Sequence, residues 1–156
     1  MLRHDASETI LILHGPNLNL FGRREPHIYG TTTLEQINER LRTLAAKIQV
    51  KLTIVQSNHE GVLVDTLQKH MDEAAGAILN PAGLTQYSVS LHDCIKAMPF
   101  PVIEVHLSNL ATREEWRHHS IISSAAKGSV QGLGWRSYTA ALRTLVEIVR
   151  EPKKAS

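Results

Sequence analysis

Apolar runs and helical patterns alternate along this 156-residue chain. Four of the apolar runs are rich in β-branched residues and lack polar alternation, which is typical of parallel strands buried on both faces. A fifth run is diluted by glycine and is the weaker candidate. Strands are therefore expected at residues 9–13, 52–56, 76–80, 102–107 and 128–134.

Between these runs, apolar residues recur three and four positions apart, which predicts helices with one buried face. A Ser or Thr followed three residues later by Glu or Gln indicates a helix start, because each side chain can cap the other's backbone N–H. The pattern occurs at Thr33 with Gln36, at Thr32 with Glu35 and at Ser57 with Glu60. Helices are expected at about 34–48, 63–71, 87–97 and 135–150, with a short helical piece at 112–120.

This alternation of strand and helix predicts an α/β three-layer sandwich with a five-stranded parallel sheet. The flavodoxin-like strand order 2-1-3-4-5 suits five strands, and one catalytic domain over residues 1–156 is expected, with flexible ends at 1–8 and 151–156. Ligands bind beyond the carboxyl ends of such strands. Polar and glycine-rich segments do follow four of the strands, at 14–30, 57–60, 80–88 and 106–117.

The connection after the first strand is unusually long. Such connections typically need about 2–6 residues, whereas almost twenty separate the first strand from the first helix. The stretch contains Gly-Pro-Asn, two adjacent arginines, a proline and Tyr29. Extra chain at this position is either disordered filler or an active-site lid, and the lid is placed at residues 21–30.

Composition narrows the classes of function. With 42% apolar residues, 21% charged residues and a net charge of +2, the chain is an ordinary globular protein without the clustered basic charge of a nucleic-acid binder. Cys94 is the only cysteine and is expected to be a buried, inert thiol. The chain contains no apolar run of membrane-spanning length and no secretory leader pattern, so a cytoplasmic location is expected.

Dinucleotide-binding, P-loop, zinc-protease and nucleophile-elbow motifs are missing, and the nine histidines show no metal-ligand spacing. Catalysis without a cofactor or metal then relies on acid–base groups and placed charges. Glu104 and His106 lie two apart at a strand end, so both leave the same face, where a carboxylate fixes the tautomer of an imidazole. A purely structural pair is the alternative reading. Asn80, at another strand end, can bind a carboxylate or carbonyl group.

Arginines supply the placed charge. Arg113 and Arg117 lie four apart, hence on one face of the expected helical piece, which favours an anionic, hydroxylated substrate over a solvated ion-pair surface. On the lid, a guanidinium close to the phenol of Tyr29 would favour the phenolate. The residues thus predict a tyrosinate base that forms when the lid closes, with His106 as the acid.

Five collinear segments, spanning about residues 9–146, resemble the type II 3-dehydroquinate dehydratases. The resemblance implies a flavodoxin-like subunit, a homododecamer built as a tetramer of trimers, and no cofactor. It also implies conversion of 3-dehydroquinate to 3-dehydroshikimate by anti elimination through an enolate, in the shikimate pathway of aromatic amino acid biosynthesis or in quinate catabolism. The segments are ILILHGPNLNLFGRREPHIYGTTTLEQI, QSNHEG, ILNPAGLTQYSVSLHD, PVIEVHLSN and REEWRHHS.

The resemblance also assigns roles. Tyr29 would remove the C2 proton, Arg24 would close the lid, Arg113 would hold Tyr29 as phenolate, and Asn17 would position a water that stabilises the enolate. His106, supported by Glu104, would protonate the departing C1 hydroxyl. The resemblance implies that Asn80 and the backbone amides of Leu107 and Ser108 bind the substrate carboxylate. Arg117 and Gln86 would bind ring hydroxyls. Asp93 would contact the substrate from across the trimer interface.

The chain departs from the family pattern at several positions. Gln86 stands where a substrate-binding histidine is expected, His92 replaces the arginine that follows, and His14 replaces a common asparagine. Gln86 can donate a hydrogen bond but cannot carry charge, so substrate affinity is the property in question. Two other functions stay open: a flavodoxin-like binding or regulatory protein, and a related dehydratase with a shifted substrate.

Overall fold

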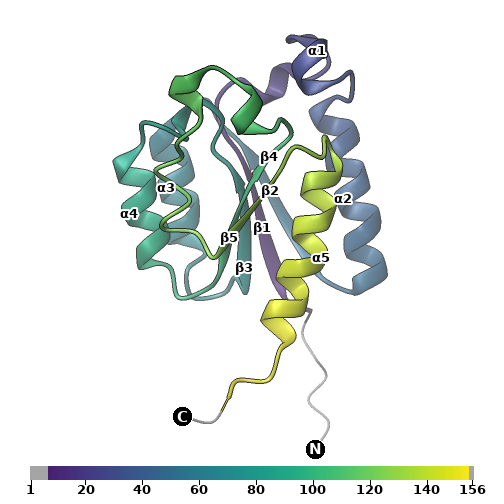
Figure 1. The fold of residues 1–156 in the computed structure, drawn as a ribbon. Helices are drawn as coiled ribbons and strands as arrows, with labels where there is room; N and C mark the ends of the chain where they lie inside the picture. The colour runs from purple at the N-terminus through teal and green to yellow at the C-terminus, as the bar shows by residue number, and fades with distance from the viewer. Residues whose placement is uncertain (1–6, 155–156) are drawn as a thin grey trace, which may run out of the picture.

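A computed structural model describes residues 7–154 as five parallel strands flanked by helices (Figure 1). The strand order β2-β1-β3-β4-β5 confirms the predicted flavodoxin-like topology. The strands are β1 (Thr9–His14), β2 (Lys51–Gln56), β3 (Gly76–Asn80), β4 (Val102–His106) and β5 (Gly128–Gln131). The α-helices are α1 (Pro26–Tyr29), α2 (Leu34–Ile48), α3 (Glu60–Lys69), α4 (Val89–Ala97) and α5 (Arg136–Arg150).

Helices cover both faces of the sheet, α2 and α5 on one side and α3 and α4 on the other (Figure 1). Alternate residues of a strand point to opposite faces. In β1, Ile10 and Ile12 therefore pack in the core with α2 and α5, whereas Leu11 and Leu13 pack with α3 and α4. Both faces of the central strands are buried, as the unalternating apolar runs predict.

Of the three predicted helix starts, the one at Thr33 is confirmed, and those at Thr32 and Ser57 are wrong. Thr33 and Gln36 form the reciprocal capping box of α2. Before α3, the N-cap is His59 without a side-chain cap, and Ser57 only accepts a hydrogen bond from the His59 N–H. Glu60 does not cap α3, because its carboxylate accepts a hydrogen bond from the Ser88 hydroxyl at 2.5 Å. A partner distant in sequence therefore replaces the local cap.

The short helix predicted at 112–120 is also wrong. The structure has two 3₁₀ turns, at Leu110–Thr112 and Glu115–Arg117, with Arg113 extended between them. A helix would pair the carbonyl of Arg113 with the N–H of Arg117. Instead the ring of His118 donates to that carbonyl (2.8 Å), and the N–H of Arg117 donates to the carbonyl of Glu114 (2.8 Å).

The ends of the chain were expected to be flexible at 1–8 and 151–156, and residues 1–6 and 155–156 of these ranges lie outside the described residues. Glu8 forms a two-point ion pair with Arg150, with both N···O distances at 2.9 Å. The last predicted strand is shorter than expected, because Gly132 turns the chain at φ 85°. Within residues 7–154, no helix is both long and apolar enough to cross a membrane.

Candidate active site

A cavity lies where the carboxyl ends of β3 and β4 meet the long β1–α2 connection. Nine of its lining residues follow β3 or β4, two are the last residues of these strands, and four come from the connection. They are Leu18, Phe21, Arg24, Tyr29, Asn80, Ala82, Gly83, Thr85, Gln86, His106, Leu107, Ser108, Leu110, Arg113 and Arg117. Nine of the twelve residues proposed from sequence therefore meet around one cavity.

Gly15 fixes where the connection leaves the sheet. Its N–H donates to the carbonyl of Asn80 at 2.8 Å, which joins the start of the connection to the end of β3. A Cβ at this position would lie 2.6 Å from the carbonyl oxygen of Pro81. Only glycine allows this approach of the two backbones, so Gly15 sets the distance between the lid segment and the β3 edge.

Tyr29 lies on the four-residue helix α1 and faces two guanidinium groups. Its hydroxyl accepts a hydrogen bond from Arg113 Nη2 at 3.1 Å. The central guanidinium carbons of Arg24 and Arg113 lie 4.9 and 5.2 Å from the centre of the tyrosine ring. The ring of Phe21 packs beside it at 5.7 Å. The predicted meeting of this tyrosine with arginine is confirmed.

Arg113 is held by partners on both sides of its guanidinium. Its side chain is 8% exposed, and Nη1 donates to the Ser108 hydroxyl at 3.1 Å. Among residues 7–154, Nε of Arg113 is the buried side-chain nitrogen that finds no hydrogen-bond partner.

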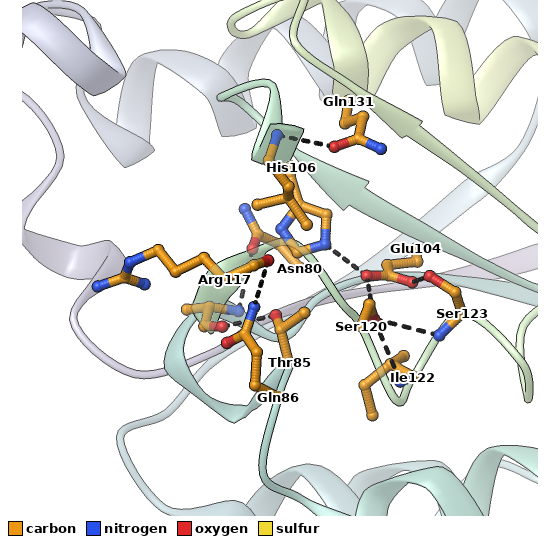
Figure 2. A network of polar contacts seen from close by, with 12 residues as sticks. Asn80, Thr85, Gln86, Glu104, His106, Arg117, Ser120, Ile122, Ser123 and Gln131 are labelled. Atoms are coloured by element: carbon orange, nitrogen blue, oxygen red, sulfur yellow. Dashed lines mark hydrogen bonds and ion pairs between the residues drawn. The ribbon is translucent and has the colours of Figure 1, made fainter. Parts of the chain in front are cut away.

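Glu104 and His106 form the pair that strand periodicity predicts. Both leave the same face of β4, and His106 Nε2 lies 2.5 Å from Glu104 Oε2 (Figure 2). Ser120 and Ser123 also donate to this carboxylate, at 2.8 and 2.5 Å. Burial raises the pKa of Glu104, but the three hydrogen bonds and the nearby imidazole outweigh it and lower the pKa overall. An ionised Glu104 thus binds Nε2–H of His106 and leaves Nδ1 for the cavity.

Polar contacts also hold Asn80 and Gln86, which line the cavity together with His106. Asn80 Oδ1 accepts from the N–H of Ala82 at 3.1 Å, and Asn80 Nδ2 donates to the hydroxyl of Tyr138 at 3.0 Å. Gln86 donates to the carbonyl of Arg117 at 3.0 Å (Figure 2). Gln86 therefore joins the loop after β3 to the loop after β4, in addition to lining the cavity.

Three residues proposed from sequence do not line the cavity. Glu104 lies behind His106, as described above. Asn17 is exposed in a left-handed conformation (φ 67°), and its N–H donates to Asn58 Oδ1 at 2.9 Å. Asp93 is exposed on α4, where it contacts the ring of its neighbour His92 at 3.0 Å. Asp93 therefore does not contact the cavity of its own chain.

Sequence reasoning missed the residues behind the site. Ser120 and Ser123 hold Glu104, while His14 and Tyr138 lie beneath Asn80. The local sequence patterns did not indicate these contacts. A polar residue at a position expected to be buried is the signal that could have found them. Within the described part of the chain, no group of three or more His, Cys, Asp or Glu residues could hold a metal ion.

Comparisons with known proteins place the chain in a family. The family model described as "Dehydroquinase class II" matches residues 8–146. A 3-dehydroquinate dehydratase from Herpetosiphon aurantiacus is 49% identical over 138 residues, covering 88% of this chain and 96% of the relative. Another, from Ralstonia nicotianae and named 3-dehydroquinate dehydratase 1, is 51% identical over 142 residues, covering 90% and 91%.

Solved structures give the same result. The type II dehydroquinase from Butyrivibrio crossotus superimposes with a TM-score of 0.89 at 33% identity, covering 91% of this chain and 99% of that one. The type II dehydroquinase from Propionibacterium acnes gives a TM-score of 0.87 at 38% identity, covering 90% and 97%. On the family match, the relatives and these structures together, the chain belongs to the class II dehydroquinase family.

Proposed function

We propose that this chain is a hydro-lyase that removes water from 3-dehydroquinate to give 3-dehydroshikimate, by anti elimination and without a cofactor. Family membership supports the reaction. The observation that carries the assignment of residues is that one cavity holds both an arginine-bound tyrosine and a carboxylate-bound histidine. These two groups are the base and the acid that an elimination needs.

Tyr29 acts as the base in this mechanism. Arg113, which donates to the phenol oxygen, and Arg24, which lies over the ring, stabilise the phenolate. The phenolate takes the proton from C2 of the substrate, and the electron pair left on carbon forms an enolate with the neighbouring ketone. Asn17, in the exposed turn at the start of the connection, positions a water that hydrogen-bonds to the enolate oxygen.

His106 acts as the acid. Glu104 accepts from Nε2–H and stabilises the imidazolium form of the ring, whose Nδ1–H supplies the proton that is transferred. As the enolate collapses, the double bond between C1 and C2 forms and the C1–O bond breaks. The departing hydroxyl takes the Nδ1 proton and leaves as water. Return of the proton from Tyr29 to His106 through solvent resets the site, so no net charge accumulates.

The cavity also suits the negative charge of the substrate. Asn80 and the backbone N–H groups of Leu107 and Ser108 bind the carboxylate, and Arg117 binds a ring hydroxyl. Gln86 supplies a second, uncharged contact to the hydroxyls. Uncharged hydrogen bonds are weaker than charge-assisted ones, so binding at position 86 is weaker here than with the histidine of the family pattern.

A dehydratase acting on a related cyclic hydroxy-keto acid is the second candidate. The observation that favours it is Gln86, whose amide already donates to the carbonyl of Arg117. A flavodoxin-like binding or regulatory protein is a third reading. It has no chemical need for Tyr29, Arg113, Glu104 and His106 together.

The test is a continuous ultraviolet assay of the purified protein with 3-dehydroquinate, following the conjugated enone with chelator present. Turnover that survives the chelator supports a metal-free dehydratase. Absence of turnover at saturating substrate, from a folded oligomer, contradicts the proposed function. Activity on other quinate-related substrates under those conditions then separates a shifted dehydratase from a binding protein.

The biological unit is proposed to be a homododecamer, a tetramer of trimers of this single catalytic domain, in the cytoplasm. Asp93 supports a multimeric site, because it is exposed on α4 and away from its own cavity. In a trimer it would complete the cavity of a neighbouring subunit. The reaction serves either aromatic biosynthesis or quinate breakdown, since both use this step.

A further inference from the structure

A chain of buried hydrogen bonds lies beneath the cavity and ends at Asn80. Parallel pairing of β1 with β3 places His14 directly beside Asn80. Both side chains leave the face that α2 and α5 cover, where His14 meets Asn38 of α2 and Tyr138 of α5. His14 and Tyr138 are 0% exposed, Asn80 is 3% exposed and Asn38 is 7% exposed.

The direction of these hydrogen bonds follows from a single backbone group. The N–H of Ala82 can only donate, so the oxygen of the Asn80 amide must face it. The Asn80 nitrogen then faces Tyr138 and donates to the phenol oxygen at 3.0 Å. Tyr138 in turn donates its hydrogen to Nδ1 of His14, 2.9 Å away.

His14 completes the series. Because Nδ1 accepts from Tyr138, the proton of the neutral ring is on Nε2, which lies 2.9 Å from Asn38 Oδ1. Each group from Asn80 through Tyr138 and His14 to Asn38 thus donates to the next. Burial lowers the pKa of His14 to about 4, opposed in part by the hydrogen bond with Asn38, which agrees with a neutral ring.

We propose that His14 and Tyr138 are positioning residues, which hold the amide of Asn80 so that its remaining N–H is presented to the substrate carboxylate. This inference rests on the proposed function, in which Asn80 binds that carboxylate. One hydrogen of Asn80 Nδ2 is donated to Tyr138, and the Asn80 side-chain oxygen accepts from Ala82. The second hydrogen on Nδ2 is therefore the one available to a ligand in the cavity that Asn80 lines.

The arrangement explains what an imidazole does at position 14. An acceptor is required opposite the Tyr138 hydroxyl, and a donor is required opposite Asn38. A neutral imidazole provides one of each across its ring. A second proton on Nδ1 would point two donors at the tyrosine oxygen and leave the tyrosine hydrogen without an acceptor in this buried network.

The first test is Tyr138→Phe, which removes the hydroxyl and keeps the ring. The released amide can rotate, so KM for 3-dehydroquinate should rise about tenfold, the effect of losing one well-placed hydrogen bond. The kcat should stay within about twofold, because the carboxylate contact is equal in ground and transition states. Thermal unfolding of the variant reports any loss of fold separately.

A double-mutant cycle gives the specific readout. In an Asn80→Ala background the tyrosine has no amide to orient, so Tyr138→Phe should not raise KM further. Equal increases in KM in both backgrounds, or an unchanged KM in the single variant, would overturn the proposal. If the wild-type protein turns over no 3-dehydroquinate, the proposed function itself fails and this inference falls with it.

The tautomer gives an independent readout that needs no turnover. Nitrogen NMR of the wild-type protein, with His14 assigned from a His14→Asn difference spectrum, should show a protonated Nε2 and a bare Nδ1 at pH 7. A proton on Nδ1 would reverse the direction of the series and refute the positioning role.

Discussion

Removing one oxygen atom from Tyr29 tests the chemistry of the site at the scale of a residue. Tyr29→Phe keeps the ring that packs against Phe21 and removes the atom that Arg113 binds. Loss of the base should lower kcat by about 10²–10⁴-fold or more, with little change in KM. The ultraviolet assay measures both constants. Tyr87→Phe, at an exposed tyrosine, is the matched control, and a Tyr29→Phe enzyme as active as this control would exclude the tyrosinate base.

Gln86 tests the departure from the family pattern. Gln86→His should restore a side chain able to carry charge, and KM for 3-dehydroquinate should fall about three- to tenfold, the value of a stronger hydrogen bond. Gln68→His, on the exposed face of α3, makes the same chemical change away from the cavity. Steady-state kinetics of both variants give the two KM values. An unchanged KM in Gln86→His means that Gln86 does not limit substrate binding.

His14 makes stability depend on pH. Burial lowers its pKa from the ordinary 6.5 to about 4 in the folded protein, so the unfolded chain binds an extra proton between these pH values. Stability is therefore complete above pH 6.5 and is lost as pH falls, by about 2 kcal/mol at pH 5. Urea unfolding at pH 7.5 and pH 5 measures the loss. His14→Asn should show a shallower pH slope, and an equal slope in both proteins would refute this account.

At the scale of elements, Gly15 controls how β1, β3 and the lid segment join. In Gly15→Ala the new Cβ would meet the backbone oxygen of Pro81 at 2.6 Å, and backbone cannot rotate away as a side chain can. The variant should lose about 1–3 kcal/mol of stability and raise KM, because the end of β3 carries Asn80. Gly61→Ala on α3 meets open space and should be neutral or stabilising. Urea unfolding and the kinetic assay compare the pair. Equal stability of the two variants would contradict the close-approach argument.

The segment after β4 shows how tertiary contacts override a local pattern. The four-residue spacing of Arg113 and Arg117 predicts a helix that presents both, yet the chain forms two 3₁₀ turns. Both arginines still line the cavity. His118 donates a hydrogen bond to the carbonyl of Arg113, and Gln86 donates one to the carbonyl of Arg117, and these bonds hold the two turns in place. The two arginines therefore lie at one cavity, as the spacing predicted, although the helix behind that prediction was wrong.

At the scale of the whole molecule, the proposed assembly makes one subunit complete another's site. A subunit carrying Asp93→Ala would keep its own base, and one carrying Tyr29→Phe would keep its own Asp93. When the two are unfolded and refolded together, some Asp93→Ala sites should receive Asp93 from a Tyr29→Phe neighbour and recover activity. The mixture should exceed the summed activity of the separately refolded variants. Activity equal to that sum would place Asp93 outside the neighbouring site.

The sequence by itself determined the fold class, the strand order and nine of the residues that line the cavity. Strand–helix alternation needs only local periodicity, and parallel strands bring their carboxyl ends to one edge whatever the intervening helices do. The pairing of Glu104 with His106 needed only the two-residue period of a strand. The residues around Tyr29 were found by their chemistry and their place in an overlong connection.

The tertiary structure alone decided which polar groups meet. Ser120 and Ser123 reach Glu104 from a later loop, and Tyr138 reaches His14 from 124 positions away. Such contacts depend on strand register and helix placement, for which local spacing holds no information. The departure from the local capping rule has the same cause, because the Glu60 carboxylate accepts from Ser88, 28 positions away, instead of capping α3.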